Sequence, residues 1–221
     1  ELTVFAGLVH APDGSGTKLA ALVPCHCGPL SAGEAATRMI REFGSPVVNT
    51  IGPMPYCEIN AMLDAGFPKG ALNYWKSSFL KEIGAEVIDT MVTYCAKRPS
   101  PMCHGLIEHQ LGGAVSRVDR EATAFNHRDV RYSFMSLGVC SDPAEAEKMI
   151  RWTRAFWEAL QPFLAGGVYV NYLGREADEG VERIKAAYGP NYQRLVALKK
   201  KYDPTNLFRL NQNIKPDTQE A

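Results

Sequence analysis

The order of strand-like and helix-like segments most restricts how this chain can fold. The first two strand-like runs follow each other across a Gly-containing turn, which predicts an antiparallel hairpin. Helical and strand patterns then alternate along the rest of the chain. This order predicts an α+β fold, in which helices pack mainly on one face of an antiparallel sheet. We predict strands over residues 2–11, 18–27, 72–80, 102–111, 130–140 and 168–173, and helices over 31–43, 85–97, 142–164, 178–188 and 191–202.

Local signals support several of these boundaries. Ser31 and Glu34 have the spacing of a capping box at a helix start, and Asp142 precedes Pro143 in the same role. The strand 130–140 is apolar on both faces, which predicts a central position. Residues 46–68 read as a long loop with one short strand. The expected apolar helix faces are Ala36, Met39, Ile40 and Phe43 in one helix and Val87, Ile88, Met91 and Cys95 in the next.

Composition excludes several classes of function. The 24 basic and 24 acidic residues cancel, so nothing favours a nucleic-acid or anionic-membrane partner. We therefore expect neither partner. The six cysteines are too sparse for a disulfide scaffold, and we expect reduced thiols in a cytoplasmic protein. Cys25 and Cys27 flank His26 without a second ligand pair nearby, so we expect no metal site.

Short motifs in the last third of the chain resemble the C-terminal segment of the berberine bridge enzyme-like flavoproteins. These proteins are FAD-linked oxidases of the vanillyl-alcohol oxidase superfamily. The motifs are Tyr169-Val170-Asn171-Tyr172, Ala187-Tyr188-Gly189-Pro190-Asn191-Tyr192, Tyr202-Asp203-Pro204 with Asn206 and Phe208, and Asn211-Gln212-Asn213-Ile214. Upstream, Tyr74 to Ser78, Glu108 to Val115 and Ala124 to Arg128 resemble the substrate domain of the same family.

The resemblance implies an organisation in two parts. Residues 1–165 would form a substrate-binding α+β domain, and residues 166–221 a helical segment that packs on it at the flavin edge. Nothing resembles the family's N-terminal FAD-binding domain, and the chain opens inside a strand, so we expect a fragment. FAD would belong to the full-length parent and would not be held by this chain alone. The expected partners are that domain and a small-molecule substrate, with a homo-oligomer possible.

The resemblance also assigns roles around Tyr169. If residues 168–173 form a strand, Tyr169 and Asn171 share one face, and Val168, Val170 and Tyr172 share the other. Tyr169 would then be the base in a hydride transfer from a C–OH, or related C–N or C–H, centre to flavin N5, and Asn171 would contact the flavin. A Tyr base needs a nearby cation or donor. The candidates are Lys76, Arg117 and Arg131.

The alternation of side chains along the predicted strand 102–111 divides a second set of candidate site residues between the two faces of the sheet. His104, Leu106, Glu108 and Gln110 share one face, and Cys103, Gly105, Ile107, His109 and Leu111 should face the helices. Gln110 is a pocket candidate. Glu108 is a fallback base, although a solvated carboxylate is the more ordinary expectation. His109 reads as a buried core histidine.

The remaining candidates line the pocket or touch the flavin. Tyr74, Trp75 and Lys76 lie on one strand, where only one of the two aromatics can face the pocket. Some members of the family carry an acidic base just after the Gly-Gly pair. Here Arg117 stands near that place, and this departure favours a Tyr base. His127 is also expected to line the substrate pocket. The C-terminal amides Asn211 and Gln212 are expected at the flavin, and Lys199 to Lys201 on a solvated helix face.

A different class of function remains open from sequence. An α+β sheet with helices on one face also serves as a non-enzymatic module for small-ligand binding or dimerisation. Flavin binding separates the two interpretations, because only the oxidoreductase needs it.

Overall fold

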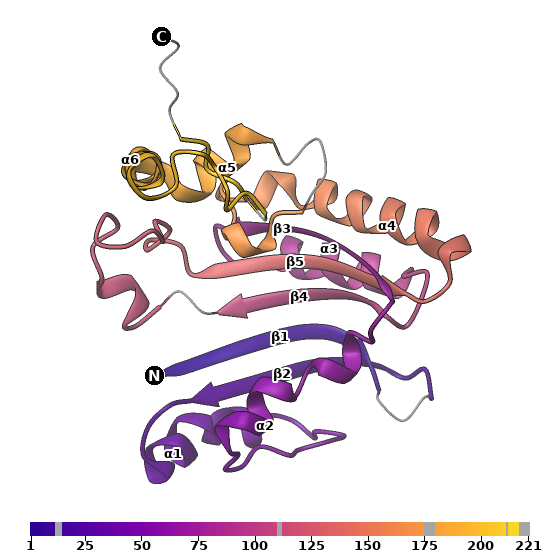
Figure 1. Ribbon diagram of the computed structural model, residues 1–221. Helices are drawn as coiled ribbons and strands as arrows, with labels where there is room; N and C mark the ends of the chain where they lie inside the picture. Colours follow the sequence, from indigo (N-terminus) through magenta and orange to yellow (C-terminus); the bar gives the residue numbers. More distant parts are fainter. Residues whose placement is uncertain (12–14, 110–111, 175–179, 211, 217–221) are drawn as a thin grey trace.

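A computed structural model describes residues 1–11, 15–109, 112–174, 180–210 and 212–216. Its centre is a five-stranded sheet in the order β2-β1-β4-β5-β3, and every neighbouring pair is antiparallel (Figure 1). The α+β prediction is confirmed. The strands are β1 (Leu2–His10), β2 (Lys18–His26), β3 (Leu72–Leu80), β4 (Cys103–His109) and β5 (Tyr132–Cys140).

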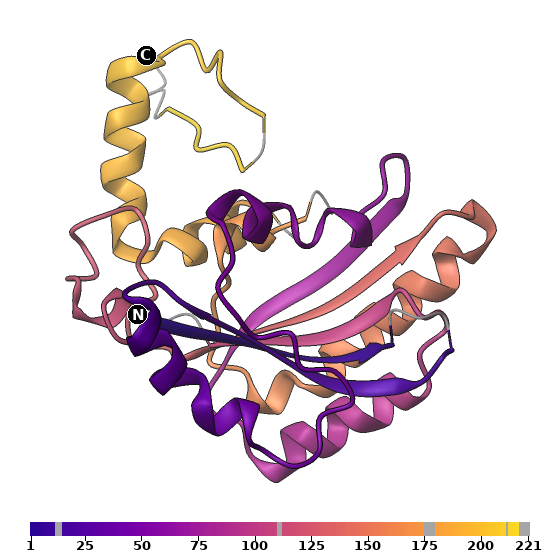
Figure 2. The same ribbon diagram turned by 90° about the horizontal axis from the view of Figure 1, so that it is seen from below.

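Two long helices cover one face of this sheet. They are α3 (Ala85–Ala96) and α4 (Ala146–Ala159); in Figure 2, α3 lies along the bottom in magenta and α4 along the right side in salmon. Alternate strand residues point into this layer, and Leu80, Ile107 and Phe134 pack there against the two helices. The cluster consists of Leu80, Val87, Met91, Cys95, Ile107, Phe134, Phe156 and Leu160. Burial of these side chains is the main stabilising term of the domain.

The opposite face of the sheet carries a second apolar cluster. Met135, Leu137 and Val139 of β5 form it, on the face opposite Phe134 of the first cluster. Trp75 and Tyr172 pack against them. Tyr172 belongs to η5 (Val170–Tyr172), a short 3-10 helix in the C-terminal segment. This segment therefore packs on the sheet face that α3 and α4 leave open.

The C-terminal segment continues with two helices, α5 (Val181–Tyr188) and α6 (Tyr192–Tyr202). They are joined by η7 (Gly189–Asn191), at the predicted Gly-Pro break. Ile184 and Ala187 of α5 form a small core with Val168 and Leu173. The helical character of this segment is confirmed, whereas its boundary at residue 166 stays a prediction.

The α4 start follows its sequence signal closely. The Asp142 carboxylate accepts a hydrogen bond from the Ala144 amide at 2.9 Å. One turn of 3-10 helix, η3 (Pro143–Glu145), leads directly into α4. Met149, Thr153 and Phe156 are buried along α4. Strand β5 is buried throughout its middle, as expected, but β4 occupies the central position.

Other local predictions were wrong. Helix α1 (Leu30–Arg41) begins after Pro29, so Ser31 lies inside the helix and forms no cap. Its predicted apolar residues Met39 and Phe43 are exposed, because α1 lies beyond the β2 edge rather than over the sheet (Figure 1). Ile88 of α3 is also half exposed.

The long loop before β3 also differs from its prediction. It contains α2 (Tyr56–Ala61) and the 3-10 turn η1 (Asp64–Gly66) instead of a short strand. Among the described residues, no helix has the length and apolar character needed to cross a membrane.

Gly138 tests the close approach of α4 to the sheet. A methyl group on Gly138 would overlap Met149 Cγ and lie 3.3 Å from Thr153 Oγ1. We expect Gly138→Ala to lower the free energy of unfolding by about 1–3 kcal/mol, because the added methyl overpacks the layer. Urea unfolding measures this. Gly52→Ala is the control, since nothing lies within 4 Å of the added methyl. Equal stability of the two variants would contradict the packing argument.

Candidate functional site

A cavity of about 290 Å³ opens on the sheet face opposite α3 and α4. Its floor is a row of side chains on three neighbouring strands. In the antiparallel register, Ser133 of β5 lies between Phe79 of β3 and Glu108 of β4. The remaining lining comes from the loop before β5 and from the C-terminal segment. The lining residues are Phe79, Glu108, Val115, Phe125, Arg128, Ser133, Tyr169 and Tyr172.

The predicted strand over residues 168–173 was wrong. Gly166 and Gly167 both have positive φ, and the 3-10 turn η5 follows them. Residues three apart lie on the same side of such a turn. Tyr172 therefore lies beside Tyr169, with ring centroids 5.2 Å apart and planes nearly perpendicular. Both tyrosines line the cavity, whereas strand alternation would have separated them.

Glu108 is buried in the cavity wall, with only 3% of its surface exposed. The Tyr172 hydroxyl lies 2.8 Å and 3.0 Å from its two carboxylate oxygens and donates to them. Because a buried carboxylate needs hydrogen-bond partners, this contact stabilises both the carboxylate and the turn. The expectation of a solvated carboxylate was wrong, while the pocket-facing direction of Glu108 was right.

Tyr169 has a polar partner from its own turn. The Asn171 amide nitrogen donates to the Tyr169 hydroxyl oxygen at 2.7 Å. The Tyr169 ring packs edge-on against Phe125, with centroids 5.8 Å apart. Sequence analysis correctly paired Tyr169 with Asn171, although a turn and not a strand brings them together.

Among the described residues that line the cavity, Arg128 carries a positive charge, and sequence analysis had not proposed it for this role. Its guanidinium lies over the Phe125 ring, 4.9 Å from the centroid. It donates to the Val115 carbonyl at 3.1 Å and to Thr123 Oγ1 at 2.7 Å. These contacts fix the position of the charge at the cavity wall.

The three cations proposed from sequence do not line this cavity. Lys76 is buried on the helix-covered face, 5.8 Å from the Trp157 ring centroid. Arg117 is exposed in the 3-10 turn η2 (Val115–Arg117). Arg131 lines a neighbouring cavity of about 670 Å³, which shares Arg128 with the first.

Tyr74 and Trp75 point to opposite faces, as alternation requires. The Tyr74 hydroxyl accepts a hydrogen bond from Arg154 of α4 at 2.8 Å, so it lies on the helix side. The Trp75 indole N–H donates to the Tyr172 carbonyl at 2.9 Å. Neither lines the cavity, but Trp75 holds the turn η5, whose Tyr172 side chain forms part of the cavity wall. Gln110 lies outside the described residues, as does the side chain of His109.

His127 lies behind the cavity and not in its lining. Its ring contacts Phe79, with centroids 4.6 Å apart, and fills the space beside Gly167. Burial lowers the pKa of His127, although the nearby Asp129 carboxylate opposes this shift. A neutral ring that fills space suits a structural support for the Gly166-Gly167 turn.

The loop that carries Arg128 also anchors the C-terminal segment. Arg120 donates to Asn126 Oδ1 at 2.8 Å, and its carbonyl accepts from Asn191 at 2.8 Å. The Asn126 side chain packs directly on Gly189. Asn126 and Asn191 are both buried. The motif around His127 and the Gly-Pro-Asn motif thus contact each other.

The side-chain amide of Gln212 holds this segment. Gln212 donates to the carbonyls of Leu173 and Gly174, at 2.9 Å and 3.1 Å. It therefore ties the end of the chain to the stretch that follows Tyr172. Asn211 lies outside the described residues.

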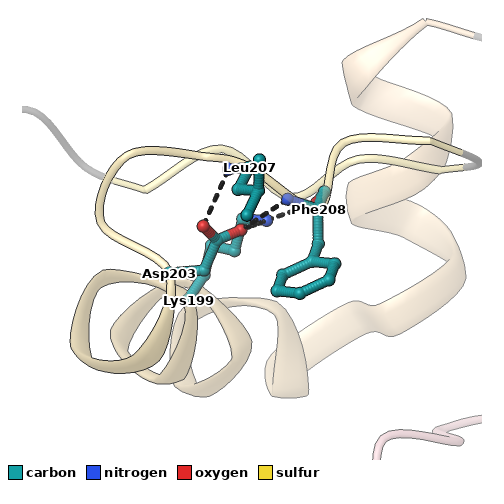
Figure 3. A network of polar contacts seen from close by, with 4 residues as sticks. All are labelled: Lys199, Asp203, Leu207 and Phe208. Carbon is teal, nitrogen blue, oxygen red and sulfur yellow. Dashed lines mark hydrogen bonds and ion pairs between the residues drawn. The ribbon is translucent and has the colours of Figure 1, made fainter.

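Asp203 organises the turn after α6 (Figure 3). Its carboxylate forms an ion pair with Lys199 and accepts from the amides of Leu207, at 2.7 Å, and Phe208, at 3.0 Å. The Lys199 contact, together with the two amides, holds the pKa of Asp203 below its usual range. The expected solvated position of Lys199 was wrong, since its side chain is only 13% exposed.

Sequence reasoning missed Tyr172, Arg128, Phe79, Phe125, Val115 and Ser133 as lining residues. A signal existed for Tyr172, because a Gly-Gly pair before a Tyr-x-x-Tyr spacing permits a turn as readily as a strand. Arg128 lay next to the proposed His127. Ser133 and Phe79 became visible only once the strand register was known.

Comparison with known proteins agrees with the fold and the motifs. Residues 168–215 match the family model described as "Berberine and berberine like". Several solved structures share the fold. Two of them are 6-hydroxy-D-nicotine oxidase of Arthrobacter nicotinovorans (TM-score 0.77, 24% identity) and berberine bridge enzyme-like 28 of Arabidopsis thaliana (TM-score 0.74, 20% identity). Each likeness covers 98% of this chain, and 48% and 50% of the respective structure.

Curated relatives identify the family. The chain is 31% identical to an FAD-linked oxidoreductase of Dictyostelium discoideum over 191 residues, which are 86% of this chain and 41% of that protein. It is 30% identical to berberine bridge enzyme-like C-1 of Nicotiana tabacum in an alignment 178 residues long, which covers 67% of this chain and 30% of that protein. The chain belongs to the berberine bridge enzyme-like family of FAD-linked oxidoreductases. It spans about half or less of the length of the relatives it matches.

Asp203→Asn tests the turn after α6. A carboxyl group whose pKa is lowered by folding stabilises the fold above its unfolded pKa, and this contribution is lost as pH falls through the folded pKa. We therefore expect Asp203→Asn to lower the melting temperature at neutral pH. The difference from wild type should shrink as pH falls below 3.8, the ordinary pKa of Asp.

Glu182→Gln is the matched control for this experiment, since Glu182 pairs with Lys185 in an exposed position on α5. Exposed pairs contribute little to stability. Thermal unfolding followed by circular dichroism across pH compares the two variants. A pH-independent effect of Asp203→Asn would show that charge does not stabilise the turn.

Proposed function

We propose that this chain forms the substrate-binding part of an FAD-linked oxidoreductase that oxidises a C–OH, or related C–N or C–H, centre of a small molecule. The observation that carries the proposal is the joint position of Tyr169 and the Tyr172–Glu108 pair at one cavity, with Asn171 donating to the Tyr169 hydroxyl. The cavity combines aromatic walls with a few polar groups, which is typical of small-molecule sites.

The described residues suit one edge of a flavin ring but not the whole of FAD. A cavity of about 290 Å³ takes a small organic molecule or part of a ring system, and a dinucleotide is far larger. FAD would then be held mainly by the part of the relatives' length that this chain does not span. Tyr169 and Asn171 would contact the flavin edge, Asn171 being exposed. When bound, FAD supplies a two-electron acceptor that takes a hydride at N5.

Tyr169 would act as the base. As a phenolate, its oxygen would take the proton from the substrate hydroxyl while the carbon gives its hydride to the flavin, so that the C–OH centre becomes a carbonyl. Negative charge on that oxygen is stabilised by the N–H that Asn171 donates to it. The Arg128 guanidinium contributes positive charge to the same cavity. Glu108 holds Tyr172, and through it the wall against which Tyr169 packs.

Tyr169→Phe in the full-length protein tests this role. Loss of a general base slows proton transfer by about 10²–10⁴-fold, so we expect flavin reduction to slow by a similar factor while the flavin stays bound. Anaerobic stopped-flow absorbance with a substrate that reduces the wild-type flavin gives the rate. Tyr202→Phe is the control, because Tyr202 is exposed and lies outside the cavity.

Two results would contradict the proposal in different ways. An unchanged rate in Tyr169→Phe would exclude Tyr169 as the base and leave the flavoenzyme assignment intact. A full-length protein that neither contains nor binds FAD would overturn the enzyme assignment. The non-enzymatic module would then be the better explanation of the cavity.

A further inference from the structure

The hydroxyl of Ser133 lies at the floor of the cavity without a partner. Ser133 is 4% exposed, and its Oγ has no hydrogen-bond partner among the residues that the structure describes. A buried hydroxyl loses its hydrogen bonds to water and regains nothing inside the protein. A ligand that supplies a partner at this position therefore gains affinity that an apolar ligand of the same shape does not.

The surroundings of Ser133 limit what that ligand can be. On one side the neighbour is the apolar ring of Phe79, and on the other Glu108, whose carboxylate already accepts from Tyr172. The aromatic rings of Phe125 and Tyr169 belong to the same lining. The Ser133 hydroxyl is thus a single polar group at the base of a cavity with aromatic walls. Such a cavity suits a flat ring that carries one polar substituent.

We propose that Ser133 is a specificity-determining residue whose hydroxyl binds a hydroxyl group on a compact aromatic ring of the substrate. The proposal rests on the proposed function only in that this ring belongs to the molecule that is oxidised. The ring lies between the aromatic walls, and its hydroxyl group reaches the floor. There it exchanges one hydrogen bond with Ser133 Oγ, and no proton is transferred.

Ser77 provides a matched comparison within the same sheet. It is 2% exposed, lies on the same face as Phe79, and its Oγ also lacks a partner among the described residues. Unlike Ser133, it does not line the cavity. The two serines thus share residue type, burial and an unpaired hydroxyl, and differ in access to a ligand.

The experiment compares two probes of similar size, phenol and fluorobenzene, by isothermal titration calorimetry on the full-length flavoprotein with oxidised flavin. We expect the wild type to bind phenol about tenfold more tightly, the effect of one hydrogen bond to an otherwise unpaired buried group. Ser133→Ala should remove this preference by weakening phenol binding alone. Ser77→Ala should keep it, and so should Ser133→Thr, which retains the hydroxyl.

Equal affinities of the wild type for the two probes, or no measurable binding of phenol, would overturn the proposal. A tenfold preference that survives in Ser133→Ala would overturn it as well. Where Ser133→Ala does not fold by circular dichroism, Ser133→Cys replaces the hydroxyl with a weak donor of similar size, and the same loss is expected.

These outcomes are independent of the base assignment, because binding is measured without turnover. An unchanged flavin reduction rate in Tyr169→Phe leaves the phenol result standing. A lost preference in Ser77→Ala, with none lost in Ser133→Ala, would place the phenol site elsewhere on the sheet and overturn the role of Ser133.

Discussion

The hydrogen bond between the Tyr172 hydroxyl and the buried Glu108 carboxylate joins the C-terminal segment to the sheet. The opposite end of the same residue is also held, because the Tyr172 carbonyl accepts from the Trp75 indole. A carboxylate in an apolar wall is costly unless it is paired, so the turn and the carboxylate stabilise each other. The cavity exists because these two contacts place the Tyr169–Tyr172 turn over strands β3, β4 and β5.

The rest of the C-terminal segment keeps that turn in position. Gln212 ties the chain end to Leu173 and Gly174, while Asn126 packs on Gly189. Asp203 holds the turn after α6 through its contacts with Lys199 and two backbone amides. Motifs that are distant in sequence thus form one polar framework around the turn. This explains why residues with strong motif signals, such as Gln212 and Asp203, contact the backbone and do not line the cavity.

The two faces of the sheet have different tasks. One face packs against α3 and α4 and supplies the main apolar core. The other carries a smaller cluster and the cavity, with polar groups supplied by strands, loop and turn. Such a division is typical of a rigid scaffold that presents a site on its open side. It also agrees with the proposal that FAD is held mainly by the part of the relatives' length that this chain does not span.

Several features of this protein follow from its sequence alone. Strand alternation placed Glu108 toward the open face, separated Tyr74 from Trp75, and buried Ile107 under the helices, because a period of two leaves no choice once a strand forms. The Asp142 cap and the Gly-Pro break depend on neighbouring residues only, and both were predicted. The motifs around Tyr169 and Tyr202 identified the family for the same reason, since they are short and contiguous.

Tertiary structure decided what depends on distant partners. Whether residues 168–173 form a strand or a turn depends on tertiary contacts. Although β3 is an edge strand, η5 packs on the open face of the sheet and does not pair with that edge. The burial of Glu108 depends on its contact with Tyr172. Arg128, and not Lys76, lines the cavity because of the conformation of the loop before β5. The row of Phe79, Ser133 and Glu108 depends on the register of three strands. Local patterns determine an element and the direction of its side chains, whereas a site arises only where separate elements meet.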